Sequence, residues 1–432
     1  MSTIHVVGGG LAGMASALAL ADAGRAVTLH EGSGHLGGRC RSFHDRRLDA
    51  VIDNGTHVLV GANRAALAFL DRIGTRDGLL AVRSLPFADA DTNETWDLRL
   101  DGGAFGLLPL PGRRLPGVPL RDHTRLWRLL WPKRGRVVAD GIDPRTPLGR
   151  RLVEPLTLAV MNAPPSEASA SLLGRVLRKT LLAGGSAGRV YVARDGLGAC
   201  LVDPAERALR QAGVAIALNR RLIGLERTDR RLAGLRFAGD TVDLDDGDGV
   251  VLALPWHGLA RILPAQTGPE GQRAIVNLHF RLDGPARLVR GGPVLGLIGT
   301  MAQWLFVRGD IASVTISAAD AGSWPADDAR AGTVWREIRR HLVDPPNRMP
   351  PCRVIAEKRA TFVQSPEQVA RRPSPRTGLR NLVLAGDWTD TGLPATIEGA
   401  IGSGRRAAGY FAAQTRPAVI QNPNAHPISG VP

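Results

Sequence analysis

The stretch IHVVGGGLAG, residues 4–13, decides the fold of this chain. A run of apolar residues enters a glycine-rich turn, and an alanine- and leucine-rich segment then leads to a second predicted strand at residues 27–31. In a strand–helix–strand unit, Gly8 permits the tight turn, Gly10 lets the backbone approach a pyrophosphate, and Gly13 allows the helix to lie close on the strand. The stretch therefore predicts a dinucleotide-binding βαβ unit.

The acidic residue Glu31 ends the second predicted strand. A carboxylate at this place accepts hydrogen bonds from a free ribose 2′-hydroxyl and repels a 2′-phosphate. We therefore expect FAD or NAD, and not NADP, as the dinucleotide.

Two further glycine motifs distinguish between FAD and NAD. Residues 37–39 are Gly-Gly-Arg, which offers backbone amides and a guanidinium to a diphosphate. Near the C-terminus, the apolar run 382–385 leads to Gly386 and Asp387, and a helix led by Pro394 is expected to follow. Amides at a helix N-terminus can face an electron-poor ring, and Asp387 can hold a ribityl chain. Together, these two motifs favour FAD over NAD.

In order and separation, these glycine motifs resemble those of the flavin-dependent amine oxidase and carotenoid desaturase superfamily. The resemblance covers roughly residues 3 to 413. It implies an α/β fold in which a Rossmann-like FAD-binding domain is interleaved with a mixed α+β substrate domain, as in amine oxidases and phytoene desaturases. Within the superfamily, four intervening segments are similar to the hydroxysqualene dehydroxylases of bacterial hopanoid pathways: residues 53–61, 154–165, 302–306 and 391–398.

The motifs and the resemblance together predict which residues contact FAD. The predicted set is Gly8, Gly10, Leu11, Ala12, Gly13, Glu31, Gly37, Gly38, Arg39, Gly55, Thr56, Leu222, Gly386, Asp387, Thr396 and Ile397. Leu222 is included because the resemblance places its backbone beside adenine. Thr56 departs from the family pattern, in which a larger amide side chain is expected, and this changes the polar contacts expected near the flavin.

The resemblance also implies a reaction. Reduced FAD would deliver hydride to an allylic carbon of hydroxysqualene while the hydroxyl group leaves as water, giving squalene. Because hydroxide leaves poorly unless it is protonated, the protein must supply an acid. The candidates are His57 and Asp195. The simpler alternatives are that His57 fixes its loop and that Asp195 caps a turn; Glu398 is expected to brace the last helix.

Two alternative functions stay open at this stage. A carotenoid-type desaturase or amine oxidase would run an oxidation instead, although the chain has only Tyr191 and Tyr410 for an aromatic cage. A GDP-dissociation inhibitor of the Rab type would use a related fold to bind prenylated proteins without flavin. The intact glycine motifs argue against this binding-protein alternative.

The domains are predicted to be discontinuous. The FAD-binding domain is expected to comprise residues 1–75, 190–255 and 378–413, and the substrate domain residues 76–189 and 256–377. A disordered tail is expected at 414–432.

Several elements are predicted within these domains. Buried strands are expected at residues 214–225 and 249–255, a hairpin at 294–307, and a helix around Val334, Ile338 and Leu342. Residues 276–282 alternate apolar and polar side chains, which predicts a strand with one apolar and one polar face. That apolar face could roof the flavin and hold an isoprenoid chain, or it could be ordinary core.

The segment 126–136, LWRLLWPKRGR, combines two tryptophans and three leucines with a basic flank. This composition is typical of a helix that lies in a membrane interface. The alternative is a helix that buries its tryptophans in the substrate domain. We expect no membrane-spanning segment, and we expect the partners to be a long isoprenoid lipid substrate, a membrane surface and other squalene or hopanoid enzymes.

The composition limits other functions. The formal net charge is +15, but only Lys133, Lys179 and Lys358 are lysines, so 52 of the 55 cationic residues are arginines. This uniform bias, without a known nucleic-acid-binding motif, argues against a nucleic-acid partner. Three dispersed cysteines predict a reducing compartment and no structural metal. Since no cysteine accompanies the C-terminal motif, FAD is expected to bind noncovalently. The protein is expected to be cytoplasmic, with contact to the inner face of the cytoplasmic membrane.

Overall fold

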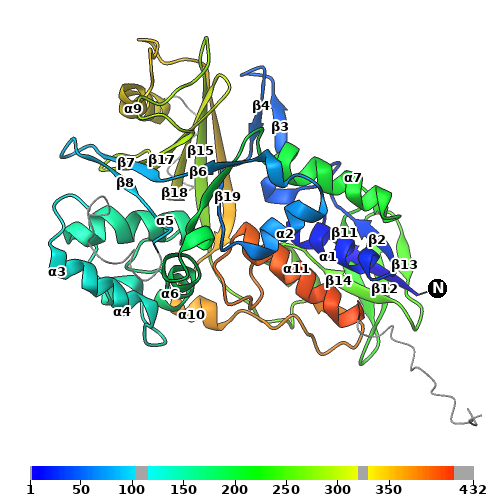
Figure 1. Ribbon diagram of the computed structural model, residues 1–432. Helices are drawn as coiled ribbons and strands as arrows, with labels where there is room; N and C mark the ends of the chain where they lie inside the picture. The colour runs from blue at the N-terminus through cyan, green and yellow to red at the C-terminus, as the bar shows by residue number, and fades with distance from the viewer. Residues whose placement is uncertain (1, 103–114, 320–328, 413–432) are drawn as a thin grey trace, which may run out of the picture.

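The fold of the chain is described by a computed structural model, which covers residues 2–102, 115–319 and 329–412. The predicted tail at 414–432 lies outside these residues. Figure 1 shows two regions side by side, one around helices α1 and α11 and the other around the long strands β15 and β19.

The first region is built on a parallel sheet with the strand order β10-β2-β1-β14-β20. Its strands are β1 (Thr3–Val7), β2 (Ala26–His30), β10 (Ala215–Ala217), β14 (Gly249–Leu252) and β20 (Leu382–Leu384). Three distant parts of the chain thus supply one sheet, whose inner strands β1 and β14 are almost entirely buried. The prediction of an α/β fold is confirmed, whereas the exact domain boundaries stay a prediction.

Helices pack on this parallel sheet and on one another. They include α1 (Leu11–Asp22), α2 (Arg64–Arg72), α7 (Asp203–Gln211) and α11 (Ile397–Ala412). The first and last helices lie side by side (Figure 1). Their approach depends on glycine, because a Cβ at Gly404 of α11 would overlap the carbonyl oxygen of Ala12 in α1. The two ends of the described chain are thereby packed together.

The single strand predicted at 214–225 was wrong. Strand β10 ends at Ala217, and Asn219 then adopts the left-handed conformation with φ 56°. The turn is fixed by the amides of Asn219 and Arg220, which donate to the carbonyl oxygens of Ser33 and Glu31 at 2.9 and 2.7 Å. The chain then enters a separate antiparallel sheet made of β11 (Leu222–Arg227), β12 (Leu232–Phe237) and β13 (Thr241–Asp243).

The second region is built on a seven-stranded mixed sheet with the order β19-β15-β18-β17-β16-β7-β8. Its strands are β7 (Leu85–Asp89), β8 (Thr95–Leu98), β15 (Gln272–Arg281), β16 (Val294–Ile298), β17 (Trp304–Arg308), β18 (Ile311–Ala319) and β19 (Cys352–Phe362). Strands β16 and β17 form the predicted hairpin, in which Val294 pairs with Phe306. The hairpin prediction is confirmed, although its second strand begins two residues later than expected.

Strand β15 has the predicted alternation, but its surroundings differ from the prediction. The apolar side chains Val276, Leu278 and Phe280 pack against helix α9 (Ala329–Ile338) and do not face the glycine motifs. Of the two alternatives left open for this apolar face, the structure therefore supports ordinary core. The opposite, polar face is buried as well, since Asn277 and His279 are 2 and 1% exposed.

Short helices cover the other face of this sheet. They are α3 (Leu120–His123), α4 (Trp127–Leu130), α5 (Glu154–Met161) and α6 (Ala170–Leu177), joined by short 3-10 and π turns. Apolar side chains of α4, α5 and α6 form one core with Phe87, Trp304 and Phe306 of the sheet. Helices α8 (Trp256–Ile262) and α10 (Pro366–Ala370) lie in connections to the first region.

Two small sheets join the regions. The first is β5 (Val58–Val60), β9 (Val190–Ala193) and β6 (Leu79–Val82), and the second is the hairpin of β3 (Ser42–Asp45) and β4 (Ala50–Asp53). The predicted helix at Val334 and Ile338 is α9, and Leu342 follows it after a 3-10 turn. Among the described residues, no helix has the length and apolar character needed to cross a membrane.

Candidate active site

The first glycine motif forms the turn between β1 and α1. Gly8 has φ 111°, a conformation that favours glycine, and its amide donates to the carbonyl oxygen of His30 at 2.8 Å. A Cβ at Gly13 would overlap the carbonyl oxygen of Gly8, so helix and strand approach closely only with glycine. A Cβ at Gly10 would meet nothing within 4 Å. The residue predicted to admit a pyrophosphate therefore faces open space, at the amino end of a helix whose first residues are the buried Leu11 and Ala12.

Glu31 is held beside this turn by hydrogen bonds within the protein. Its Oε2 accepts the backbone N–H of Gly9 at 2.7 Å, and its Oε1 accepts the N–H and hydroxyl of Ser33 at 2.8 and 2.9 Å. The neighbouring Leu222 is buried at the start of β11. The carboxylate thus has a fixed place, which suits the binding of a ribose.

The second glycine motif contacts the first. The amide of Gly37 donates to the carbonyl oxygen of Gly9 at 2.9 Å, and Gly10 and Gly37 form an isolated parallel bridge. Gly37 and Gly38 both have positive φ, at 101° and 55°. Their conformation turns the chain so that Arg39 follows directly beside the turn after β1.

Arg39 joins the N-terminal and C-terminal motifs. Its Nη2 lies 2.8 Å from Oδ1 of Asp387, and its Nη1 donates to the carbonyl oxygen of Ala360. The carboxylate of Asp387 is almost buried, and it raises the pKa of Arg39. Two motifs 348 residues apart therefore meet as a charged pair.

The C-terminal motif is fixed by its own hydrogen bonds. Gly386 has φ 143°, and its amide donates to the hydroxyl of Ser403 at 3.0 Å. The hydroxyl of Thr396 accepts the amide of Gly399 at 3.2 Å, just where α11 begins at Ile397. Gly386, the residue before Asp387, is therefore tied to α11 at Ser403.

Glu398 links the last helix to α2. Its carboxylate accepts the backbone N–H groups of Ala65 and Ala66, at 3.1 and 2.9 Å. These are in the first turn of α2, where a negative charge stabilises the helix. Glu398 therefore ties α2 to α11.

The loop with Gly55, Thr56 and His57 lies against the polar face of β15. The side-chain amide of Asn277 donates to the carbonyl oxygen of Asn54 at 3.1 Å, and a Cβ at Gly55 would come 3.2 Å from that amide nitrogen. Thr56 and His57 are half-buried. Burial lowers the pKa of His57, while the charge of Asp53 raises it and that of Arg39 lowers it.

These residues fit a flavin dinucleotide. Gly10 leaves room where a diphosphate must approach, Glu31 is positioned for a ribose, and Arg39 pairs with Asp387 of the C-terminal motif. The three predicted motifs are thus brought into one continuous region.

Comparison with known proteins identifies the family. The family model of flavin-containing amine oxidoreductases matches residues 11–131 and 141–410. The hydroxysqualene dehydroxylase of Rhodopseudomonas palustris is 43% identical over 96% of this chain and 99% of its own length, and that of Sinorhizobium fredii is 40% identical over 95 and 99%. The chain belongs to the hydroxysqualene dehydroxylase family. Cyclohexylamine oxidase from Brevibacterium oxydans shares the fold, with a TM-score of 0.68 and 15% identity over 96% of this chain and 99% of that one.

Membership of the hydroxysqualene dehydroxylase family confirms the predictions of an α/β flavoenzyme and of FAD as the cofactor. The roles of the individual residues stay predictions. None of the three buried cysteines, Cys40, Cys200 and Cys352, forms a disulfide, and burial raises the pKa of Cys40 to about 12. A thiol with such a pKa is unreactive near neutral pH.

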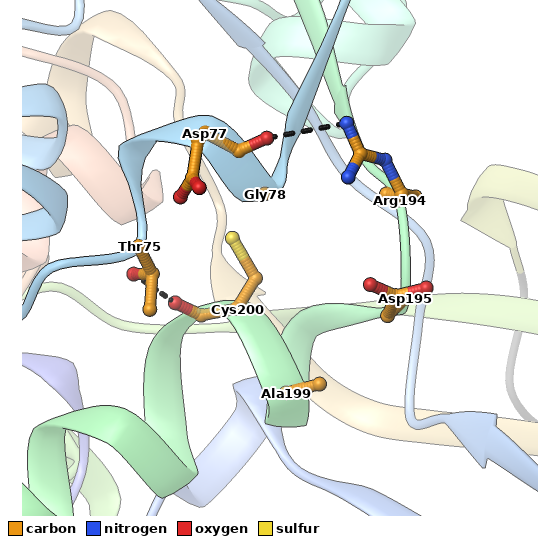
Figure 2. A pocket seen from close by; sticks show the side chains of 7 residues that line it. All are labelled: Thr75, Asp77, Gly78, Arg194, Asp195, Ala199 and Cys200. Atoms are coloured by element: carbon orange, nitrogen blue, oxygen red, sulfur yellow. Dashed lines mark hydrogen bonds between the residues drawn. The ribbon is translucent and has the colours of Figure 1, made fainter.

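The two acid candidates have different positions in this hydroxysqualene dehydroxylase family member. His57 lies in the loop beside Arg39, whereas Asp195 is exposed. Figure 2 shows Asp195 at the edge of a pocket with Thr75, Asp77 and Cys200. That pocket holds about 250 Å³, and none of its lining residues is a predicted FAD contact. The structure does not bring Asp195 to the glycine motifs.

Sequence reasoning missed the residues that hold the loop of His57. Asp53 is 1% exposed and pairs with Arg308 of β17, and it accepts the amide of Leu197 at 3.0 Å. The side-chain amide of Asn54 donates to Glu357 of β19 at 3.3 Å. These partners are distant in sequence, so the only local signal was the polar sequence Asp53-Asn54 directly after an apolar strand.

Proposed function

We propose that this chain catalyses the reductive dehydroxylation of hydroxysqualene to squalene with FAD as its redox cofactor. The observation that carries the proposal is the identity of 43% to a hydroxysqualene dehydroxylase over 96% of the chain. The meeting of Arg39 and Asp387 beside the first glycine motif supports the same conclusion, because a flavoenzyme needs all three motifs in one place.

The chain's own residues have separable tasks in this proposal. Gly10 and the start of α1 admit the diphosphate, Glu31 binds the ribose, and Asp387 binds the ribityl chain. When bound and reduced, FAD supplies the two electrons that replace the carbon–oxygen bond by a carbon–hydrogen bond. Asn277 holds the loop of residues 54–57 against the sheet, so that the position of His57 is fixed.

We assign His57 as the source of the proton that leaves with the hydroxyl oxygen. It is half-buried beside Arg39 and Asp53, whereas Asp195 is exposed in a separate pocket. Since burial lowers the pKa of His57 below 6.5, its protonated form is a minority near neutral pH and is a stronger acid than an ordinary protonated histidine.

We further propose a cytoplasmic location at the inner face of the cytoplasmic membrane. Squalene and its hydroxylated precursor are long hydrocarbons that partition into lipid, so an enzyme acting on them gains from contact with a membrane surface. Enzymes that supply hydroxysqualene and consume squalene would work at the same surface.

The experiment uses FAD-loaded protein, a chemical reductant such as dithionite and detergent-dispersed hydroxysqualene, with squalene measured by mass spectrometry. We expect squalene only when reductant and protein are both present. If no squalene forms and the oxidised protein instead desaturates a phytoene-like polyene, the chain is a desaturase. A protein that stays colourless after FAD reconstitution would point to the prenyl-binding alternative.

A further inference from the structure

The helical stretch from Leu120 to Trp131 carries an exposed apolar stripe. It runs through α3, a 3-10 turn at Thr124–Leu126 and α4, and it lies at the outer edge of the second region (Figure 1). Leu120, Trp127 and Trp131 are 51, 39 and 61% exposed. Trp127 and Trp131 lie four residues apart, which places them on the same side of the stretch, and Leu120 is exposed at its start.

The tryptophans are outward-facing although the helix beneath them is firmly packed. Their rings stack with centroids 6.1 Å apart. On the opposite face Leu129 and Leu130 are buried against helix α6, and Arg178 donates to the carbonyl oxygen of Leu130. The exposed indoles are therefore a property of a fixed surface, and the alternative that this segment buries its tryptophans was wrong.

Basic side chains flank the stripe. The exposed cations of this segment are Arg121, Arg125, Arg128, Lys133, Arg134 and Arg136. Two of them are paired, Arg125 with Asp122 and Arg136 with Asp140. The other four form no ion pair with a described residue, so the stripe has an uncompensated positive border.

The buried side of the stretch continues into the core beneath it. Leu129 and Leu130 belong to the apolar cluster that contains Met161 of α5 and Trp304 of β17. The carbonyl oxygen of Met161 accepts the side-chain amide of Gln364, whose Oε1 accepts the amide of Ala395 just before α11. The core beneath the stripe is therefore joined through hydrogen bonds of Gln364 to the segment that precedes α11.

We propose that Leu120, Trp127 and Trp131, with their basic border, form the surface by which this chain binds a membrane containing anionic phospholipid. Indole rings insert at the level of the headgroups, and arginine and lysine side chains pair with lipid phosphates. The proposal rests on the proposed function in one respect, since a substrate dissolved in lipid gives membrane contact its use. We choose a lipid surface as the binding partner because its apolar interior suits the exposed stripe and its phosphates suit the unpaired cations.

The test compares binding to vesicles of phosphatidylcholine with and without phosphatidylglycerol, measured by flotation of the full-length, FAD-loaded protein. We expect binding to the anionic vesicles, weakened by salt, with a blue shift of tryptophan fluorescence. The double variant Trp127→Ser/Trp131→Ser should bind at least roughly tenfold more weakly, and Arg121→Gln/Arg128→Gln should lose roughly tenfold or more, since each cation near the surface contributes about 1 kcal/mol. The matched control is Ile223→Ser/Val289→Ser, which removes exposed apolar side chains elsewhere and should bind as the wild type does.

Squalene formation from detergent-dispersed substrate separates this proposal from the proposed function. The tryptophan variant should retain its flavin and its activity in detergent while losing activity on vesicle-embedded substrate. Unchanged vesicle binding by the tryptophan variant would overturn the membrane proposal. Wild-type binding that is equally strong with and without phosphatidylglycerol would overturn it as well. The membrane proposal would also be overturned if the wild type were a dimer in detergent-free buffer and the tryptophan variant a monomer, since the stripe would then bind a second copy. If the wild type formed no squalene from detergent-dispersed substrate, only the proposed function would be overturned.

Discussion

At the residue scale, Gly10 and Gly13 lie one helical turn apart and meet different constraints. A Cβ at Gly13 would overlap the carbonyl oxygen of Gly8, while one at Gly10 would meet nothing. Both belong to the same glycine motif, so only their surroundings separate a folding role from a binding role.

The first prediction contrasts substitutions at these two positions. Gly10→Ala should fold with an unchanged thermal midpoint but bind FAD at least roughly tenfold more weakly, because the methyl group occupies the space that the diphosphate needs. Gly13→Ala should lower the free energy of unfolding of the apoprotein by roughly 1–3 kcal/mol, because the helix must move away from the strand. Thermal unfolding and FAD titration measure the two effects. Equal FAD affinity of Gly10→Ala and the wild type would contradict the assigned diphosphate position.

The second prediction concerns the proton donor. His57→Gln should retain FAD and slow the reoxidation of reduced flavin by hydroxysqualene about a hundredfold, within the usual range for general acid catalysis. Burial lowers the pKa of His57 below 6.5. The wild-type rate should therefore fall as the pH rises through this lowered pKa, because His57 loses its proton there. The variant should lose this pH dependence.

Glu357 is the control for that assignment, since it accepts a hydrogen bond from Asn54 in the same loop. Glu357→Gln can preserve that bond through its amide oxygen, so the reaction should slow by less than roughly tenfold and keep its pH dependence. A pH-independent Glu357→Gln, together with a pH-dependent His57→Gln, would transfer the acid role to Glu357.

At the element scale, the packing of α1 against α11 joins the two ends of the described chain. Gly404 meets the backbone of Ala12, whereas Gly409 on the same helix faces open space. Gly404→Ala should therefore lower the free energy of unfolding by roughly 1–3 kcal/mol. Gly409→Ala should raise it by roughly 0.5–1 kcal/mol, because alanine favours a helix more than glycine does. Urea midpoints give the order of the two variants, and a lower midpoint for Gly409→Ala than for Gly404→Ala would contradict the packing.

Elements with a strong local pattern could be predicted from the sequence. The βαβ unit, the hairpin at 294–307 and the helix around Val334 each have a periodicity that is visible within a short window. The strand predicted at 214–225 failed because Asn219 and the carbonyl oxygens of residues 31 and 33 stop it, and those oxygens come from a distant turn.

Tertiary surroundings could not be predicted in the same way. The alternation in β15 gave two faces, but only the position of α9 shows which face is ordinary core. The FAD motifs were found because glycine constraints are local, whereas Asp53 and Asn277 act through partners far away in the sequence. The exposure of Trp127 and Trp131 likewise depends on how α4 packs on α6.

At the scale of the whole molecule, stability should depend on buried histidines. His30 and His279 are each 1% exposed, and burial lowers their pKa values to about 3 and about 4 from 6.5. Both are neutral in the folded state near neutral pH. The unfolded chain therefore binds more protons below pH 6.5, and the free energy of unfolding falls as pH drops from 6.5 toward 4.

The fourth prediction follows from these buried histidines. Each should cost roughly 2 kcal/mol of stability on going from about pH 7 to about pH 5. The urea midpoint measured across this range should fall, and it should fall less in His279→Gln. A midpoint that rises on acidification, or that has the same slope in wild type and variant, would contradict the assigned neutral state.

The most direct test of the whole account is a single anaerobic turnover. FAD-loaded, reduced protein is mixed with hydroxysqualene, flavin reoxidation is followed by absorbance, and the extracted lipid is analysed by mass spectrometry. We predict one squalene formed for each flavin reoxidised, with no oxygen or other acceptor present. Reduced flavin that persists without squalene, despite confirmed FAD occupancy and dispersed substrate, would contradict the proposed dehydroxylation.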